Sequence, residues 1–351
     1  MNVDKIMLLS FFLLTSSFAQ TLEITIDNKP SVFGSAKILE GVWTDEQLKG
    51  SADDKKIRRL SPPDLKPPEK ILPSILDNPL DKELRNSIRS VMPSYDDKVI
   101  ALTFDLCEKA DEVTGYDADI INILRSRKVE ATFFAGGEWM RSHEEKTMQL
   151  MADPLFELGN HGWSHGNLAK LSHDKIVEQI LWTQAQYELI REKLQQRVSA
   201  RGLDLNEMDK IPQSPALFRP PYGRCSPDAL DTLAEYGLAS IQWSIVSGDP
   251  VKSQTPKKLV ETVLDQAKPG SIVIFHANGR GYATAEALPI IIDNLKEKGY
   301  KFLTVSELLK AGKIESFTDC FEVKPHDNER YDRLFGTGTG EKAGARPIPI
   351  R

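Results

Sequence analysis

Two histidines four residues apart are the first feature of this sequence that could carry out chemistry. They are His161 and His165 in the segment NHGWSH, and the whole chain contains only six histidines. On a helical turn or in a tight loop, this spacing brings both imidazoles to the same side, where they can share a metal ion. Taken alone, the spacing also fits two surface histidines, so the prediction of a metal site depends on which groups lie near them.

Asp105, Arg219 and His276 each follow a short apolar run that is typical of a buried strand. A carboxylate in such a position can act as a general base or bind a metal. Arg219 opens the segment RPPYG, whose two prolines stiffen the loop, and its guanidinium can orient a carboxylate through paired hydrogen bonds. His276 can act as a proton donor. Each residue also has an ordinary interpretation, as a cap, a structural ion pair or a buried core histidine.

Between residues 97 and 312, short apolar runs alternate with amphipathic segments, which predicts parallel strands joined by crossover helices. About seven such units favour a closed or nearly closed barrel, and an open doubly wound sheet is the alternative. Barrel active sites form at the carboxyl ends of the strands, so the reactive side chains named above should converge on one mouth. The predicted strands are 99–104, 131–135, 155–158, 217–218, 239–243, 271–275 and 301–304.

Five short segments, in this order, resemble the motifs of the polysaccharide deacetylase family, the NodB-like carbohydrate esterases. They are Thr103-Phe104-Asp105, the pair His161 and His165, Arg219-Pro220-Pro221-Tyr222-Gly223, Trp243 with Asp249, and Ile274-Phe275-His276. The resemblance covers residues 96–312 and implies an α/β fold, a distorted (β/α)7 barrel, which agrees with the strand pattern.

The resemblance also implies which residues activate water and bind the metal. Asp105 would be the base that activates water, and Arg219 would orient it. His161 and His165 would hold a divalent metal, usually zinc. Such a metal polarises a carbonyl and lowers the pKa of bound water. Hydrolysis of an amide requires this activation, because an amide carbonyl reacts slowly with water.

For the second half of the site, the resemblance implies a proton donor and a pocket. His276 would protonate the leaving amine, and Asp249 would adjust its pKa, because a nearby carboxylate keeps an imidazole protonated near neutral pH. Trp243 would pack beside the acetyl group. Tyr222 would contribute its backbone N–H to stabilise the developing oxyanion.

The chain departs from the family pattern directly after Asp105. The family usually has a second aspartate there as the third metal ligand, whereas this chain has Leu106, which cannot bind a metal. Three outcomes are open. Asp105 itself joins His161 and His165 as a ligand, another acid such as Glu108 reaches the metal, or the site binds metal weakly or not at all. We expect the two histidines to hold the metal, with Asp105 or water completing the site.

Three cysteines, Cys107, Cys225 and Cys320, allow one disulfide and leave one thiol. Cys107 and Cys225 lie just after two of the motifs, so a disulfide between them could brace the two loops at the barrel mouth. Pairing of Cys107 with Cys320 is the alternative. No CxxC pair is present, which argues against a thiolate zinc site.

The two ends of the chain differ in composition from the barrel region. Residues 1–19 have the apolar run and the Ser-Phe-Ala cleavage site of a signal peptide, which predicts a periplasmic or secreted protein. Residues 20–95 include many prolines and are expected to form an irregular arm. Residues 313–351 are expected to form an extension, disordered between 336 and 346. No later segment is long and apolar enough to span a bilayer.

The formal net charge is −6, and the chain lacks the concentrated basic patches that nucleic-acid binding uses. We therefore expect an exported hydrolase that removes N-acetyl groups from an amino-sugar polymer, peptidoglycan or chitin-like, by metal-assisted amide hydrolysis. The alternative is a non-catalytic glycan-binding protein that retains the fold, which Leu106 would favour. An amidase acting on a small non-sugar C–N bond is a third interpretation, which predicted export makes less attractive.

Overall fold

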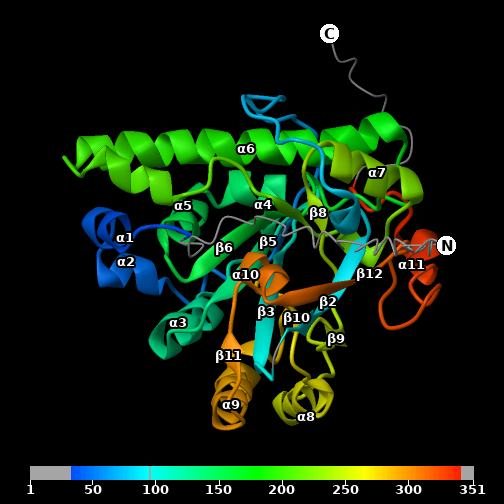
Figure 1. The fold of residues 1–351 in the computed structure, drawn as a ribbon. Coiled ribbons are helices and arrows are strands. Elements are labelled where there is room, and N and C mark those ends of the chain that lie inside the picture. Colours follow the sequence, from blue (N-terminus) through cyan, green and yellow to red (C-terminus); the bar gives the residue numbers. More distant parts are fainter. Residues whose placement is uncertain (1–32, 95, 341–351) are drawn as a thin grey trace, which may run out of the picture. The chain divides into compact units, whose positions relative to one another are not determined.

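The computed structural model describes residues 33–94 and 96–340, and its central element is a curled sheet surrounded by helices (Figure 1). The strands of this sheet are β2 (Ser87–Pro93), β3 (Val99–Leu106), β5 (Ala131–Ala135), β6 (Phe156–Asn160), β7 (Leu217–Phe218), β8 (Ala239–Ser240), β9 (Ile245–Val246), β10 (Ser271–His276), β11 (Lys301–Phe302) and β12 (Gly312–Phe317). They follow the order β12-β2-β10-β3-β5-β6-β7-β8, with β9 paired to β10 and β11 paired to β3.

The centre of the sheet is parallel, as the alternation of strands and helices predicts. β10 and β3 pair in parallel from Ser271 opposite Ile100 to His276 opposite Asp105. This register places the predicted proton donor and the predicted base next to each other at the carboxyl ends of two neighbouring strands. β5, β6, β7 and β8 continue the sheet in parallel on the other side of β3.

The sheet closes into a barrel through β2. This strand pairs antiparallel to β10, and its Ile88 forms a bridge to Ile241, directly after β8. The main-chain N–H of Gln242 donates to the carbonyl of Ile88 over 2.7 Å. The predicted distorted barrel is confirmed, and the open doubly wound sheet is wrong. The closing strand comes from residues 20–95, which were expected to be an irregular arm.

The two faces of β3 have different surroundings, because successive side chains on a strand point in opposite directions. Ile100, Leu102, Phe104 and Leu106 belong to the large core cluster that the strands share with the helices. Val99 and Ala101 belong to a second cluster, shared with β2, β8 and β10. The odd-numbered side chains, which include Asp105, therefore share the face that leads to the barrel mouth.

The helices begin where the sequence supplies caps and proline. Ser226 accepts a hydrogen bond from the third residue of its helix, and Pro227 occupies the first helical position, as predicted. Thr255 and Pro256 do the same for another helix. Among the described residues, no helix has both the length and the apolar character needed to cross a bilayer. The helices are α1 (Ala36–Val42), α2 (Asp45–Lys49), α3 (Ala118–Arg127), α4 (Gly137–Ser142), α5 (Glu144–Ala152), α6 (His173–Ala200), α7 (Pro227–Glu235), α8 (Pro256–Gln266), α9 (Thr284–Glu297), α10 (Val305–Lys310) and α11 (Arg330–Phe335).

The segments outside the predicted barrel region are more ordered than their composition suggests. Ile38 of α1 is fully buried in the main core, and a two-stranded sheet pairs β1 (Arg58–Arg59) with β4 (Glu112–Val113). β12 lies along β2, although it begins at the predicted end of the barrel domain. The predicted signal peptide, 1–19, lies outside the described residues.

Candidate active site

The carboxyl ends of the central strands surround a cavity of about 540 Å3. Most of the residues singled out from the sequence line it: Asp105, His165, Tyr222, Trp243, Asp249 and His276. Arg219 and His161 lie behind this wall, fully or almost fully buried. The structure therefore brings the predicted residues together at one mouth, and adds Cys107 to the lining.

Asp105 and Arg219 form a buried ion pair. Nη1 of Arg219 donates to Oδ1 of Asp105 over 2.8 Å and to the Thr103 hydroxyl, while Nε and Nη2 donate to the carbonyls of Ile241 and Gln242. One nitrogen thus binds the carboxylate, rather than the paired hydrogen bonds expected. Burial raises the pKa of Asp105, but the charge of Arg219 and the nearby histidines outweigh it and hold the pKa below its ordinary value. Asp105 is therefore ionised at neutral pH.

His276 and Asp249 form the second pair, next to the first, because His276 lies opposite Asp105 at the ends of β10 and β3. Nδ1 of His276 donates to Oδ1 of Asp249 over 2.9 Å, and the His276 main-chain N–H donates to Oδ2 over 2.7 Å. The hydroxyls of Ser247 and Thr284 complete the partners of this carboxylate. Burial lowers the pKa of His276, but the charge and the hydrogen bond of Asp249, together with the charge of Asp105, outweigh burial, so that the pKa lies above its ordinary value. The imidazole is thereby held in its proton-donating form.

His161 presents an unused nitrogen to the interior. Its Nδ1 donates to the Arg219 carbonyl over 2.8 Å, so the neutral ring has its lone pair at Nε2. That atom is buried and has no hydrogen-bond partner among the described residues, and it lies 3.5 Å from Oδ2 of Asp105. Burial lowers the pKa of His161 and of His165. Both rings are therefore neutral, the form that binds metals.

Cys107 completes a group of three metal-binding side chains with His161 and His165. Its Sγ and one nitrogen of each histidine all lie within 4.8 Å of one another. Burial raises the pKa of the Cys107 thiol to about 12, so the thiol is neutral until a cation lies beside it. A buried, unpartnered imidazole nitrogen beside a thiol and a second imidazole is a donor set that fits a divalent ion such as zinc. Asp105, which was expected to complete the site if water did not, is outside this group, although its Oδ2 lies 3.5 Å from Nε2 of His161.

The other expected sources of a third ligand lie elsewhere. Leu106 is fully buried in the core cluster on the opposite face of β3. The Glu108 carboxylate accepts hydrogen bonds from the main-chain N–H of Thr114, over 2.8 Å, and from its hydroxyl. Burial raises the pKa of Glu108 to about 7. Glu108 thus secures the loop after β3 and does not join the metal-binding group.

Tyr222 and Trp243 form the apolar side of the cavity. Tyr222 has a left-handed backbone (φ 58°), which costs free energy for a residue with a Cβ and is found mainly at functional sites. Its ring contacts that of His165 edge-on, with centroids 4.3 Å apart. The indole N–H of Trp243 donates to the Glu322 carbonyl over 3.0 Å, which fixes the ring beside Ile274 in the wall.

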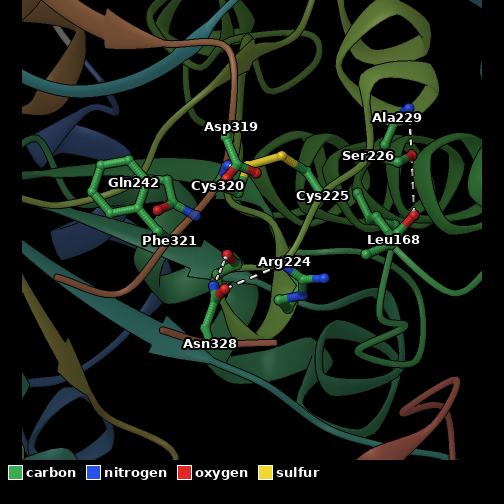
Figure 2. Close-up of a disulfide and its surroundings, with 12 residues drawn as sticks. Leu168, Arg224, Cys225, Ser226, Ala229, Gln242, Asp319, Cys320, Phe321 and Asn328 are labelled. Carbon is green, nitrogen blue, oxygen red and sulfur yellow. Dashed lines mark hydrogen bonds between the residues drawn. A yellow bond between two sulfur atoms is a disulfide. The ribbon is translucent and has the colours of Figure 1, made fainter. Parts of the chain in front are cut away.

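The disulfide joins Cys225 to Cys320, with Cα atoms 5.5 Å apart (Figure 2). Both pairings expected for Cys107 are therefore wrong, and Cys107 is a buried free thiol. The physical reason is that Cys320 follows β12, which returns along β2 to the loop after Arg219. Cys107 instead follows β3 into the cavity, where its sulfur faces the histidines.

Residues 320–340, called here the C-terminal strap, bind the loops that carry the site. Thr339 accepts from the main-chain N–H of Ala110, Thr337 from that of Asn167, Gly338 from the Tyr222 hydroxyl, and Asp332 from the Arg224 guanidinium. Asn328 donates to the Gly223 carbonyl. The strap thus ties together the loops after β3, β6 and β7. The extension was expected to be disordered from 336 to 346. Residues 336–340 instead make the hydrogen bonds of the strap, and residues 341–346 lie outside the described residues.

Two residues of the site were missed by sequence reasoning. Cys107 was considered only as a disulfide partner, although counting by two from Asp105 along the strand places both on one face. Asn278 donates through Nδ2 to the carbonyl and to Sγ of Cys107, over 2.8 and 3.1 Å. It stands two residues after His276, and no sequence pattern links it to Cys107.

The sequence of this chain is similar to those of known proteins. The sequence profile of the family described as polysaccharide deacetylase matches residues 93–210. A peptidoglycan-N-acetylglucosamine deacetylase of Bacillus cereus is 31% identical over 217 residues, which cover 61% of this chain and 89% of the relative.

Solved structures give the same result. A peptidoglycan N-acetylglucosamine deacetylase in complex with 4-naphthalen-1-yl-N-oxidanyl-benzamide is 28% identical, with a TM-score of 0.52, over 65% of this chain and 94% of that one. A CE4 family pseudoenzyme from Bacillus anthracis is 26% identical, with a TM-score of 0.51, over 66% of this chain and 71% of that one. A mutant of that pseudoenzyme with restored enzymatic activity matches with a TM-score of 0.52. With the barrel and the five motifs in place, this chain belongs to the polysaccharide deacetylase family.

Proposed function

We propose that this protein hydrolyses the N-acetyl groups of an amino-sugar polymer, most closely peptidoglycan N-acetylglucosamine. The observation that carries the proposal is the placement of two oppositely charged pairs at one cavity. The Asp105–Arg219 pair keeps a carboxylate ionised, and the Asp249–His276 pair keeps an imidazole protonated. Two groups whose pKa values are displaced in opposite directions are typical of a general base and a general acid.

In this proposal Asp105 removes a proton from water as it attacks the acetyl carbonyl. Nη1 of Arg219 holds Oδ1 of the carboxylate through a hydrogen bond of 2.8 Å and is itself positioned by donating to the Thr103 hydroxyl, which leaves Oδ2 of Asp105 to accept the proton. Arg219 is a positioning residue, because its other donors bind main-chain carbonyls and do not reach the cavity. General base catalysis of this kind contributes about 10²–10⁴-fold to the rate.

His276 then gives a proton to the leaving nitrogen. An amine leaves poorly as an anion, so the C–N bond breaks only when nitrogen is protonated. Nδ1 of His276 is bound to Asp249, so Nε2 is the nitrogen that carries the transferable proton. Asp249 is a second positioning residue, since it acts through His276.

His161 and His165 would hold the divalent metal. When bound there, the metal polarises the acetyl carbonyl and lowers the pKa of the attacking water. The chain's own contribution is to keep both imidazoles neutral by burial and to orient His161 through its hydrogen bond to the Arg219 carbonyl.

The apolar wall would receive the acetyl methyl group. Trp243 and Ile274 lie in the cavity beside the acid–base pairs, with Tyr222 on the metal-binding side. We propose that the Tyr222 main chain supplies a donor to the oxyanion, because its left-handed backbone fixes the orientation of that peptide group. A glycan substrate is supported by the relatives, which are peptidoglycan deacetylases.

Export of the protein is supported by two independent features. The Cys225–Cys320 disulfide is stable in an oxidising compartment, which is where such bonds persist. The apolar N-terminal segment and its cleavage site are typical of a signal peptide. We infer that the protein acts in the periplasm or outside the cell, where its polymeric substrate lies.

Acetate release tests the proposal. The purified protein, supplied with zinc or cobalt, should release acetate from peptidoglycan fragments or chitin oligomers. Asp105→Asn should lower kcat about 10²–10⁴-fold, because the amide cannot accept the proton.

Asp153→Asn is the matched control, since Asp153 is also buried and paired with an arginine, Arg125, at 2.7 Å, but does not line the cavity. It should lower stability and leave kcat close to that of the unmodified protein. Equal losses in both variants would show that the Asp105 effect is structural.

A non-catalytic glycan-binding protein is the second candidate. It is favoured by the similarity to a CE4 family pseudoenzyme and by Leu106 at the usual position of a metal ligand. Absence of acetate release from every substrate, together with measurable binding of chitin oligomers, would support this candidate against the enzyme.

A further inference from the structure

We propose that Cys107 takes the place of the usual carboxylate as the third metal ligand, so that a thiolate and two imidazoles bind the metal. This inference rests on the proposed function only for the presence of a metal. The geometry that carries it is the group of Cys107, His161 and His165, whose ligand atoms lie within 4.8 Å of one another. The site is thereby completed by residues already in place.

The strand itself explains why position 107 takes over from position 106. Leu106 packs among the helices in the main core, so in this chain the residue after Asp105 faces away from the histidines. Cys107 lies two positions beyond Asp105 and therefore returns to the same face. Its sulfur lines the cavity, as Asp105 does.

The surroundings of the sulfur are those of a metal ligand. Nδ2 of Asn278 donates to Sγ over 3.1 Å and to the Cys107 carbonyl over 2.8 Å, and outer hydrogen bonds of this kind orient ligands. On the other side, Nε2 of His161 is buried and has no hydrogen-bond partner within residues 33–94 and 96–340. A buried polar atom in that state costs free energy, and a shared cation would satisfy it together with the sulfur.

A thiolate preserves the charge of the site but changes its preference among metals. It contributes one negative charge, as a carboxylate does, yet it is a softer ligand. Sulfur and imidazole ligands favour zinc, cobalt or copper, whereas carboxylate and water suit magnesium, calcium or manganese. The site should therefore prefer zinc and cobalt to manganese by a wider margin than an Asp-His-His site would.

Cobalt spectroscopy tests the ligand directly, without substrate. The full chain, with its disulfide intact, is freed of metal with a chelator and titrated with Co²⁺. A near-ultraviolet sulfur-to-cobalt charge-transfer band should appear and saturate at one metal per chain. The band has a single possible source, because Cys225 and Cys320 are joined to each other and Cys107 is the remaining cysteine.

Substitutions separate the ligand from its neighbours. Cys107→Ser should abolish the band and weaken Zn²⁺ binding at least ~10–100-fold, the loss that even an outer-shell partner causes. Cys107→Asp should bind Co²⁺ without the band. Glu108→Gln is the control, because Glu108 is bound to Thr114 and lies outside the ligand group, and should retain both band and affinity.

The proposal is overturned if the unmodified chain binds Co²⁺ without a charge-transfer band, if it binds no metal, or if Cys107→Ser binds Zn²⁺ with unchanged affinity. These outcomes are independent of acetate release. Saturable thiolate binding without hydrolysis would leave the ligand assignment standing and remove the enzyme. Hydrolysis that continues after complete chelation would leave the enzyme standing and remove the metal from its mechanism, without bearing on the ligand assignment.

Discussion

The two sides of the cavity satisfy their polar groups in different ways. On the acid–base side, both oxygens of Asp249 accept hydrogen bonds, from His276, Ser247 and Thr284. On the metal-binding side, Nε2 of His161 has no partner among the described residues, although it is buried. The carboxylate of Asp249 therefore needs no group beyond the protein's own side chains. The lone pair of His161 Nε2, in contrast, is left available for a metal ion.

The comparison predicts two kinds of loss, and the largest effects should come from the histidines themselves. His276→Gln should lower kcat about 10²–10⁴-fold, because glutamine has no acidic proton to give, while the metal content stays the same. His161→Gln should instead lower both metal content and activity. Metal analysis and kcat, measured on the same preparations, distinguish the two. Loss of metal in His276→Gln would break the division of the cavity into two sides.

A smaller effect is expected from the support behind Cys107. Asn278→Ala removes the donor to Sγ and to the Cys107 carbonyl, and should weaken Zn²⁺ binding about 10–100-fold. Competition with a chromophoric chelator measures this affinity. A thermal melt of the metal-free variant checks that it is folded, since Asn278 is fully buried. Unchanged affinity in a folded variant would show that Asn278 serves only the loop.

The smallest effect should be a change in pH dependence from Asp249→Asn. The Asp249 charge raises the pKa of His276, so its removal lowers that pKa. Activity that needs protonated His276 is lost as pH rises through this pKa, and the alkaline limb of the kcat profile should therefore move to lower pH. The rate below the limb should change less than tenfold, because the proton donor is still present. If the alkaline limb of the kcat profile stays at the same pH in Asp249→Asn, that limb reports the titration of a group other than His276.

The sequence predicted the elements whose signal is local. β5 and β7 have the predicted bounds, and Ser226 caps its helix as expected. The strand that closes the barrel was missed, because its pairing of Ile88 with Ile241 joins residues far apart in the chain. A proline-rich stretch before β2 also concealed its apolar pattern.

The candidate site was predicted in its motif residues and missed in its departures from the motif. Asp105, Arg219, Asp249 and His276 pair as expected because each follows a strand end in a fixed barrel. The Cys107 ligand could have been found by counting along β3. The partner of Cys320 could not, since it depends on the path of β12 along β2.

The C-terminal strap has a consequence for the order in which the protein matures. Its residues are synthesised after every loop that it holds, including those of Ala110, Asn167 and Tyr222. The metal-binding loops are thus made before their fastening, and the fastening is completed by Cys320 once an oxidant is available. The last segment to be synthesised thus fastens loops that earlier segments form, so the wall of the cavity is completed only after the whole strap has been made.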